Sequence, residues 1–489
     1  SGADLREDRQ TEVELDGYFR GRGELLNNLD LDRGPTPSGR HLYPLPTARP
    51  DRPWLTHGDM RLRTDVSMYP KNTQIGVHLR LDVVDNLPFG STPRGTPLTT
   101  TAQRPVDSPH ALRVKRAYAR ALTPVGVFAV GRMGADWGLG LLANSGSCPE
   151  CDYGDAADRI AWMAPIADHI WGLAFDVAYR GPTVSRRSPY RDLDLDPSDN
   201  VRTVTAAVAK YRRKWVRERR RRAGRSTIDY GLYVSHRWQR NDTPTHYRYQ
   251  TDEPPNSRQV MRRGFRATAV DGWFRWVHPV LRVELELAYI HGRIDEPSLT
   301  PGIRFDGALT SDQYGGALET EFGAPESRLT GGLDAGYASG DRAPGFGANP
   351  DDRPSPPSPG DLDGPQFAPP SDFAVNNFQF HPDYRIDRIL FREIIGTVTD
   401  AAYLRPHGRW TFLKSGPSRL SAELAAPVSW AVQPASTPGG ASPLGLELDP
   451  SLVYRNLRGF EVSLDYGVLF PVWMLEATDR RRARLTRFR

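Results

Sequence analysis

Long apolar runs are missing from this sequence of 489 residues, of which 38% are hydrophobic. A membrane-spanning helix needs about 18 or more consecutive apolar residues, and no segment approaches that length, so a helical membrane protein is excluded. Apolar residues at helical spacing are almost absent as well. A membrane protein made of strands remains open, because barrel strands alternate in polarity and their mean hydropathy is low.

Lysine and cysteine are also scarce. Only five of the 64 basic residues are lysine, and the formal net charge is +5. The arginine bias fits a GC-rich genome or the recognition of anions, and the sequence leaves both explanations open. We expect no nucleic acid as a partner. The chain contains no G-x-S-x-G, no H-E-x-x-H and no phosphate-binding glycine loop, so we expect a protein that is not an enzyme and has no catalytic residues.

Alternation of apolar and polar residues is what the sequence does contain. From Leu281 to Tyr289 every second residue is apolar, and Arg282, Glu284 and Glu286 stand between them. This period of two is typical of a strand with one apolar and one wet face. The pattern recurs at 12–20, 59–68, 75–83, 171–179, 228–234, 329–337 and 444–470. It predicts an all-β chain.

The connections between these segments alternate between short and long. Short turns are expected at 69–73, 122–126, 164–169, 276–280, 323–327 and 455–459, and long polar connections at 27–55, 86–110, 135–157, 181–199, 241–258, 293–309, 339–383 and 433–442. In an up-and-down antiparallel array, alternate connections lie at opposite ends. The pattern therefore predicts a transmembrane up-and-down antiparallel β-barrel of about 18 strands (16–18), with short periplasmic turns and long extracellular loops.

This barrel would be an integral protein of the bacterial outer membrane. Residues 1–10 are expected to form an N-terminal periplasmic segment and residues 11–489 a single barrel domain. The expected partners are outer-membrane lipid and lipopolysaccharide, a hydrophilic solute and, in a second hypothesis, an envelope protein. A soluble all-β protein of this length would be expected to show repeats or domain breaks, and neither is found.

The polar faces of the strands give the candidate pore-lining residues. A barrel of about 16–18 strands is wide enough for an aqueous channel. The candidates are Arg20, Arg61, Arg63, Arg80, Asp82, Arg132, Arg282, Glu284, Glu286, Glu447, Glu461 and Asp465. Arginines from early strands and acids from late strands could face each other across the lumen and orient dipolar solutes. The alternative is that they neutralise each other in ion pairs.

Two adjoining motifs resemble a known group of proteins. The stretch "AYARALTPVGVFAVGRMGADWGLG" (117–140) resembles the hairpins of outer-membrane porins and polysaccharide-export barrels. Together with "NSGSCPECDYGDAADR" (144–159), it resembles an uncharacterised, myxobacterial-type family of outer-membrane barrels. The resemblance implies a channel fold without an assigned substrate. One departure is the ending "LTRFR", since such barrels usually end on an aromatic assembly signal; a C-terminus further on or an unusual signal would explain it.

The cysteines and nearby acids suggest two features of the long connections. Cys148 and Cys151 form "CPEC" in a connection expected outside the cell, without the βαβ setting of a redox motif or further zinc ligands, and a structural disulfide is the favoured interpretation. No cofactor is expected, with one weak exception. Closely spaced carboxylates would suit calcium, although a solvated acidic loop is the simpler explanation. These residues are Asp152, Asp155, Asp158, Asp192, Asp194 and Asp196.

The run "YRRKWVRERRRRAGR" (211–225) is the strongest concentration of charge. It falls at an expected periplasmic turn, where it could contact lipid phosphates, bind an acidic partner or simply extend a strand into solvent. The sequence as a whole predicts an outer-membrane channel, porin-like, for hydrophilic solutes or for export of a polar polymer. The alternative is a plugged barrel that anchors or scaffolds a surface or envelope-spanning complex.

Overall fold

The structure, a computed structural model, describes residues 11–32, 42–45, 54–71, 73–90, 112–178, 199–242, 260–298, 304–324, 326–341, 373–437, 440–456, 458–471 and 483–489. The strands are β1 (Glu12–Asn27), β2 (Trp54–Tyr69), β3 (Ile75–Pro88), β4 (Arg113–Thr123), β5 (Gly126–Gly134), β6 (Ala156–Ile166), β7 (His169–Ala178), β8 (Val201–Lys210), β9 (Thr227–Gln239), β10 (Phe265–Val277), β11 (Leu281–Ile294), β12 (Leu309–Phe322), β13 (Leu329–Ala338), β14 (Ala401–Ser415), β15 (Ser418–Ala425), β16 (Val428–Ala431), β17 (Pro443–Asn456), β18 (Phe460–Pro471) and β19 (Ala483–Phe488). Three short helices accompany them, α1 (Lys214–Arg222), a π-helical turn η1 (Leu390–Ile394) and a 3₁₀ turn η2 (Pro434–Ser436). None of the described helices is long and apolar enough to span a membrane.

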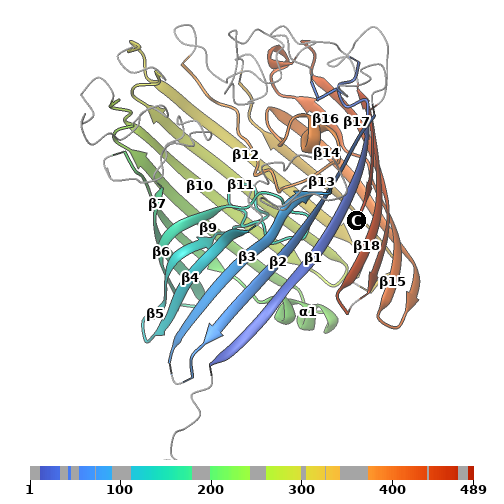
Figure 1. Cartoon of the computed structure of the whole chain (residues 1–489), viewed down its shortest axis with the longest axis horizontal. Coiled ribbons are helices and arrows are strands. Elements are labelled where there is room, and N and C mark those ends of the chain that lie inside the picture. Colours follow the sequence, from blue (N-terminus) through green and yellow to red (C-terminus); the bar gives the residue numbers. More distant parts are fainter. Residues whose placement is uncertain are drawn as a thin grey trace, which may run out of the picture.

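The strands form one closed antiparallel barrel (Figure 1). Except for β15 and β16, which do not pair with each other, strands that follow one another in the sequence are paired, and β19 pairs with both β18 and β1. Strands β15 and β16 both lie between β14 and β17 and share one position, so the nineteen strands occupy eighteen positions. The predicted all-β, up-and-down barrel of about 18 strands is confirmed.

The distribution of polarity across the barrel wall is the inverse of that in a soluble protein. Outward apolar side chains are exposed, for example Leu173 at 53% and Leu287 at 56%. Inward charged side chains are buried, for example Arg61 and Glu286, both at 0%. Charged residues are almost never fully buried unless they are paired. The alternation therefore places mainly apolar residues outside and paired charges inside, as in barrels that face lipid.

The two ends of the barrel differ as expected. The turns after β2, β4, β6, β10, β12, β14 and β17 lie at one end, called here the short-turn end (Figure 1). The intervening longer connections leave from the opposite end. The basic run at 211–225 lies at the short-turn end, as predicted, but it folds into α1 rather than extending a strand. Arg221 of α1 donates hydrogen bonds to the carbonyl groups of Pro279 and Gly323, which fixes the helix against two neighbouring turns.

Among the described residues, two long segments run through the lumen. The first inward segment comprises residues 136–155, between β5 and β6, and the second comprises residues 376–400, before β14. The second segment supplies much of the apolar core of the protein, including Phe378, Phe380, Ile389 and Leu390. These side chains pack against inward-facing apolar residues of the wall, among them Leu444, Leu469 and Leu485. Their burial removes apolar surface from water, which stabilises the folded segment inside the barrel.

Candidate functional site

The first inward segment crosses the lumen from wall to wall. On one side, the backbone N–H groups of Gly140 and Leu141 donate to the Glu286 carboxylate of β11 at 3.0 and 3.2 Å, and that of Leu139 donates to it as well. Trp137 donates from its ring N–H to Asp271 of β10 at 2.8 Å. These hydrogen bonds satisfy buried polar groups on both partners. They fix the start of the segment to β10 and β11.

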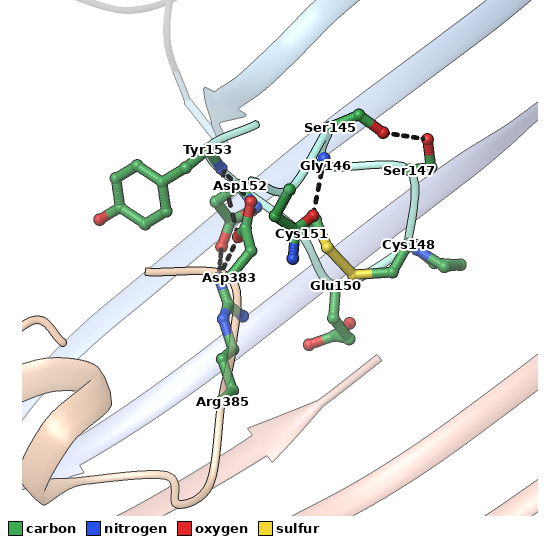
Figure 2. Close-up of a disulfide and its surroundings, with 12 residues drawn as sticks. Ser145, Gly146, Ser147, Cys148, Glu150, Cys151, Asp152, Tyr153, Asp383 and Arg385 are labelled. Carbon is green, nitrogen blue, oxygen red and sulfur yellow. Dashed lines mark hydrogen bonds and ion pairs between the residues drawn. A yellow bond between two sulfur atoms is a disulfide. The ribbon is translucent and has the colours of Figure 1, made fainter. Parts of the chain in front are cut away.

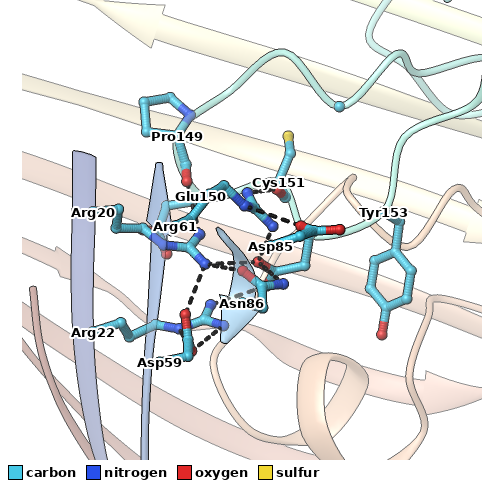
Figure 3. A network of polar contacts seen from close by, with 12 residues as sticks. Arg20, Arg22, Asp59, Arg61, Asp85, Asn86, Pro149, Glu150, Cys151 and Tyr153 are labelled. Carbon is cyan, nitrogen blue, oxygen red and sulfur yellow. Dashed lines mark hydrogen bonds and ion pairs between the residues drawn. The ribbon is translucent and has the colours of Figure 1, made fainter. Parts of the chain in front are cut away.

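The other side of the segment is bound by arginines of β1 and β2. The guanidinium groups of Arg20, Arg22 and Arg61 lie close together (Figure 3). All three donate to the carboxylate of Asp152, at 2.9 to 3.1 Å. Arg61 also donates to the carbonyl of Cys151 at 2.5 Å. In the ring of eighteen positions, β1 is opposite β10. The first segment is therefore a bar across the full width of the lumen.

The predicted disulfide between Cys148 and Cys151 is present in this bar (Figure 2). It closes a tight turn, with the backbone N–H of Cys151 donating to the carbonyl of Cys148 at 3.2 Å. Arg20 donates to the carbonyl of Pro149 at 2.8 Å. The disulfide thus lies inside the barrel rather than in an external loop, and it shapes the turn that presents Glu150 and Asp152.

The second inward segment meets the first at Asp152. The carboxylate of Asp383 accepts hydrogen bonds from the backbone N–H groups of Asp152 and Tyr153, at 2.9 and 3.1 Å (Figure 2). Arg385 donates to the Asp152 carboxylate at 2.9 Å. Burial alone would raise the pKa of Asp152, but the charges of Arg22, Arg385 and Arg20 outweigh it and hold the pKa below its usual range. Asp152 is therefore a permanent anion that links the two segments.

A second carboxylate anchors the second segment to the wall. Glu447 of β17 accepts from the backbone N–H groups of Arg388, Ile389 and Leu390 at 2.9, 2.9 and 3.1 Å. Arg388 pairs with Asp465 of β18 at 2.9 Å. The arrangement repeats that at Glu286, because one wall carboxylate again binds three successive N–H groups.

The linked segments separate two cavities. The upper cavity, of about 210 Å³, lies toward the long connections and is lined by Tyr43, His57 and Glu393 among others. The lower cavity, of about 430 Å³, lies toward the short-turn end and includes Arg405, Arg409 and Arg455. Arg385 and Arg392 line both cavities. These two arginines are the boundary between the chambers.

Some guanidinium nitrogens at this boundary and in the lower cavity lack a hydrogen-bond partner, although each of these side chains forms an ion pair through another nitrogen. Nε and Nη1 of Arg385, Nε of Arg388 and Nε of Arg405 are buried without a hydrogen-bond partner among the described residues. All three side chains line the lower cavity. Buried donors are normally hydrogen-bonded, so these nitrogens retain unused capacity for hydrogen bonds beside the lower cavity.

The predicted pore-lining residues occupy several different positions. Arg20, Arg61 and Arg63 are buried against the first inward segment, and Asp82 pairs with Arg63 at 2.7 Å. The inward residues Arg80, Arg282, Glu284, Glu286, Glu447, Glu461 and Asp465 all take part in hydrogen bonds or ion pairs within the lumen. The pairing follows the second alternative, in which opposite charges neutralise each other.

Arg132 is a correction to the predicted set. It has the same parity on β5 as Phe128 and Val130, which are exposed on the outer face, whereas Met133 is buried inside. On that outer face it pairs with Asp158 at 2.8 Å. The apolar-polar alternation of β5 fails at this residue because an outward ion pair interrupts it.

The predicted calcium ligands are divided among different contacts. Asp152 is held by arginines, Asp158 pairs with Arg132, and Asp155 lies 3.5 Å from the imidazole of His381. No group of three or more potential ligand side chains occurs in the described part of the chain. Asp192, Asp194 and Asp196 lie outside the described residues, and calcium binding there stays a prediction.

The boundary arginines were not identified in the sequence. Arg385, Arg388 and Arg392 lie in a connection without alternation, where periodicity gives no direction for a side chain. The sequence does contain one sign that this segment is ordered. The three arginines are spaced three and four residues apart, next to the apolar residues Ile389, Leu390 and Phe391.

Comparisons with known proteins give structural similarity only. No family model matches the chain, and no curated protein matches it. Solved structures that resemble it include the outer membrane protein OpdK from Pseudomonas aeruginosa, with 10% identity, coverage of 98% of this chain and 97% of that chain, and a TM-score of 0.46. A BenF-like porin from Pseudomonas fluorescens Pf-5 shows 10% identity, 99% and 97% coverage and a TM-score of 0.45. An anion-selective porin from Comamonas acidovorans shows 8% identity, 98% coverage of each chain and a TM-score of 0.41. With TM-scores below 0.5, these similarities carry no conclusion about function, and the myxobacterial-type family stays a prediction.

Proposed function

We propose that the protein is an outer-membrane channel for small hydrophilic solutes, and that it prefers anions. Its apolar outer face would contact lipid and lipopolysaccharide, with the short turns in the periplasm. The observation that carries the proposal is the position of Arg385 and Arg392, which line both the upper and the lower cavity. A solute that moves between the cavities must pass these two guanidinium groups.

The preference for anions follows from the unpartnered nitrogens of Arg385, Arg388 and Arg405. A carboxylate or phosphate oxygen would accept hydrogen bonds from them, and guanidinium groups bind such planar, charged acceptors well. Small solutes are favoured over a polymer, because the chambers measure about 210 and 430 Å³ and the inward segments lie between them.

The test is a planar-bilayer recording of the purified protein under a salt gradient. We expect small, discrete conductance steps and a reversal potential that shows preference for anions. Substituting Arg405→Gln should reduce that preference about fivefold, the equivalent of about 1 kcal/mol. Arg405 lines the lower cavity but does not contact Asp152, so this variant leaves the link between the segments intact.

A matched control is Arg293→Gln, since Arg293, near the end of β11, pairs with Asp295 just after that strand and lines neither chamber. Its reversal potential should equal that of the unmodified protein. An unchanged reversal potential in the Arg405 variant would contradict the anion preference.

A plugged barrel that anchors an envelope complex is the second candidate function. It is favoured by the link between the two inward segments at Asp152, Asp383 and Arg385, which crosses the lumen. The same recording distinguishes the two functions, because a plugged barrel would insert into the bilayer without conductance steps.

A further inference from the structure

The helix α1 and its flanks leave much of their positive charge unneutralised. Residues 211–225 contain nine basic residues and one acid. Asp229 of β9 pairs with two of them, Arg212 and Arg217, at 3.3 and 3.6 Å. Within the part of the chain that the structure describes, four arginines of this run form no ion pair: Arg213, Arg219, Arg222 and Arg225. Like charges one turn apart destabilise a helix, so an anionic partner would stabilise this one.

Contacts with the barrel determine which face of α1 points away from it. Arg217 and Arg221, one turn apart, are directed at the barrel, since Arg217 pairs with an aspartate of β9 and Arg221 donates to two turn carbonyls. Successive residues of an α-helix are about 100° apart, so Trp215 and Arg219 lie on the side opposite these two residues. Arg222 shares that side, because residues at i, i+4 and i+7 are aligned. We call the exposed residues Trp215, Arg219 and Arg222 the outer face of α1.

The outer face of α1 points into water rather than toward lipid. Directly before the helix, the ring of Tyr211 lies 6.3 Å from that of Trp273 and 5.4 Å from the guanidinium of Arg275, both inward-facing residues of β10. Arg217 lies 5.4 Å from the same tyrosine ring. The barrel side of α1 is therefore at the opening of the lumen at the short-turn end (Figure 1). The opposite side faces away from the lumen, into the aqueous space at that end.

The outer face of α1 combines an aromatic ring with two guanidinium groups. Trp215 is 56% exposed, and the guanidinium of Arg219 lies 5.4 Å from the centre of its ring. Tryptophan and arginine are among the residues that contribute most to the energy of protein–protein interfaces. An inorganic anion or a small solute would bind the arginines but leave the ring in water. A polypeptide can cover the ring and neutralise both charges.

We propose that the outer face of α1 binds an acidic segment of a partner polypeptide, with an apolar side chain on Trp215 and carboxylates at Arg219 and Arg222. Guanidinium groups match carboxylates in charge and geometry. The hydrogen bonds of Arg221 hold α1 in place before the partner arrives, which lowers the entropic cost of binding. The proposal rests on the proposed function only for the orientation of the short-turn end toward the periplasm. Binding is measured without conductance, so a failure of either one can be told from a failure of the other.

The test measures binding of a fluorescent peptide to the full chain in phosphatidylcholine nanodiscs, which leave both ends of the barrel accessible. The peptide has about 16 residues, enough to form a helix. It carries a leucine and two glutamates at positions i, i+4 and i+7, the spacing of the outer face of α1. Its control has the same composition, with the glutamates moved to the opposite side of the helix. From fluorescence anisotropy we expect the Kd of the peptide to be at least about tenfold lower than that of the control, and to rise with added salt.

Substitutions in α1 complete the test. In the double variant Arg219→Gln, Arg222→Gln the Kd should rise at least about tenfold, and Trp215→Ala should raise it as well. The double variant Arg266→Gln, Arg293→Gln removes the same charge near the long connections, where both arginines lie beside Asp295, and should leave the Kd unchanged.

Charge reversal gives a variant that gains binding. Arg219→Glu, Arg222→Glu should bind a peptide that carries arginine in place of glutamate. The proposal is overturned if the control peptide binds equally, or if Arg219→Gln, Arg222→Gln binds the peptide as the unmodified chain does. It is also overturned if phosphatidylglycerol in the nanodisc displaces the peptide completely, which would assign the outer face of α1 to lipid headgroups.

Discussion

Asp152 forms ion pairs with four arginines inside the lumen. Its carboxylate contacts Arg20, Arg22 and Arg61 on the wall and Arg385 on the second inward segment. Its folded-state pKa is lowered, so these ion pairs contribute stability at any pH above the ordinary range of an aspartate and are lost only as the pH falls toward the lowered value. The link should therefore hold throughout mildly acidic conditions.

Asp152→Asn should weaken the link between the two inward segments, although the hydrogen bonds from the backbone N–H groups of Asp152 and Tyr153 to Asp383 remain. The substitution leaves buried arginines without a counter-charge, and removing one partner of a buried ion pair costs about 3–5 kcal/mol. We expect a lower midpoint in urea unfolding in vesicles, together with larger and noisier conductance. The control is Asp155→Asn on the same segment, whose side chain is 57% exposed and should change neither measurement. Equal stability of the two variants would contradict the role assigned to Asp152.

Glu284 shows what alternation can and cannot predict at the scale of one residue. The alternation Leu281, Val283, Leu285 correctly indicates that Glu284 points inward. It does not indicate its partners: Trp273 of the neighbouring strand β10 donates to it at 2.9 Å, and Arg282, two residues earlier on β11, donates at 2.8 Å. The sequence alone suggests that Glu284→Arg would fold normally. Because Arg275 also lies 3.5 Å away, the new arginine would meet two like charges, and destabilisation is expected instead.

The two inward segments are attached to the barrel wall in the same way. In each, three successive backbone N–H groups donate to one wall carboxylate, Glu286 for the first and Glu447 for the second. A sequence rich in proline, glycine and aspartate predicts an exposed connection, and alternation is absent from both segments. Their inward course depends on contacts between residues more than a hundred positions apart for the first segment, and no local pattern contains that information.

Glu447→Ala should release the second segment from β17. Three buried N–H groups would lose their acceptor, at about 1–3 kcal/mol each before relaxation. Trypsin cuts after arginine, so we expect Arg388 and Arg392 to become cleavable in the folded protein. Glu423→Ala is the control, since Glu423 lines the lower cavity without binding this segment. Resistance to trypsin equal to that of the control would show that the apolar packing of Ile389 and Leu390 holds the segment without Glu447.

At the scale of the molecule, strand periodicity and the alternation of connection lengths predict the barrel, its approximate size and its two unlike ends. Both are local properties and can be read directly. The contact that closes the barrel cannot be read in this way, because β19 pairs with β1 and the two strands lie at opposite ends of the chain. The helix α1 was missed because its nine residues are dominated by arginine and lack an apolar stripe.

The outward apolar belt gives a prediction for the whole molecule. Leu287 lies midway along β11 and is 56% exposed, while Leu329 lies at the start of β13 beside the short turns and is 69% exposed. If both face lipid, Leu287→Arg should cost about 2–4 kcal/mol and Leu329→Arg about 0–1 kcal/mol, because the cost of a charge falls from the midplane to the interface. Urea unfolding in phosphatidylcholine vesicles measures both. A soluble barrel would show no such difference, because both side chains would already be in water, so equal costs would exclude the membrane orientation on which the channel depends.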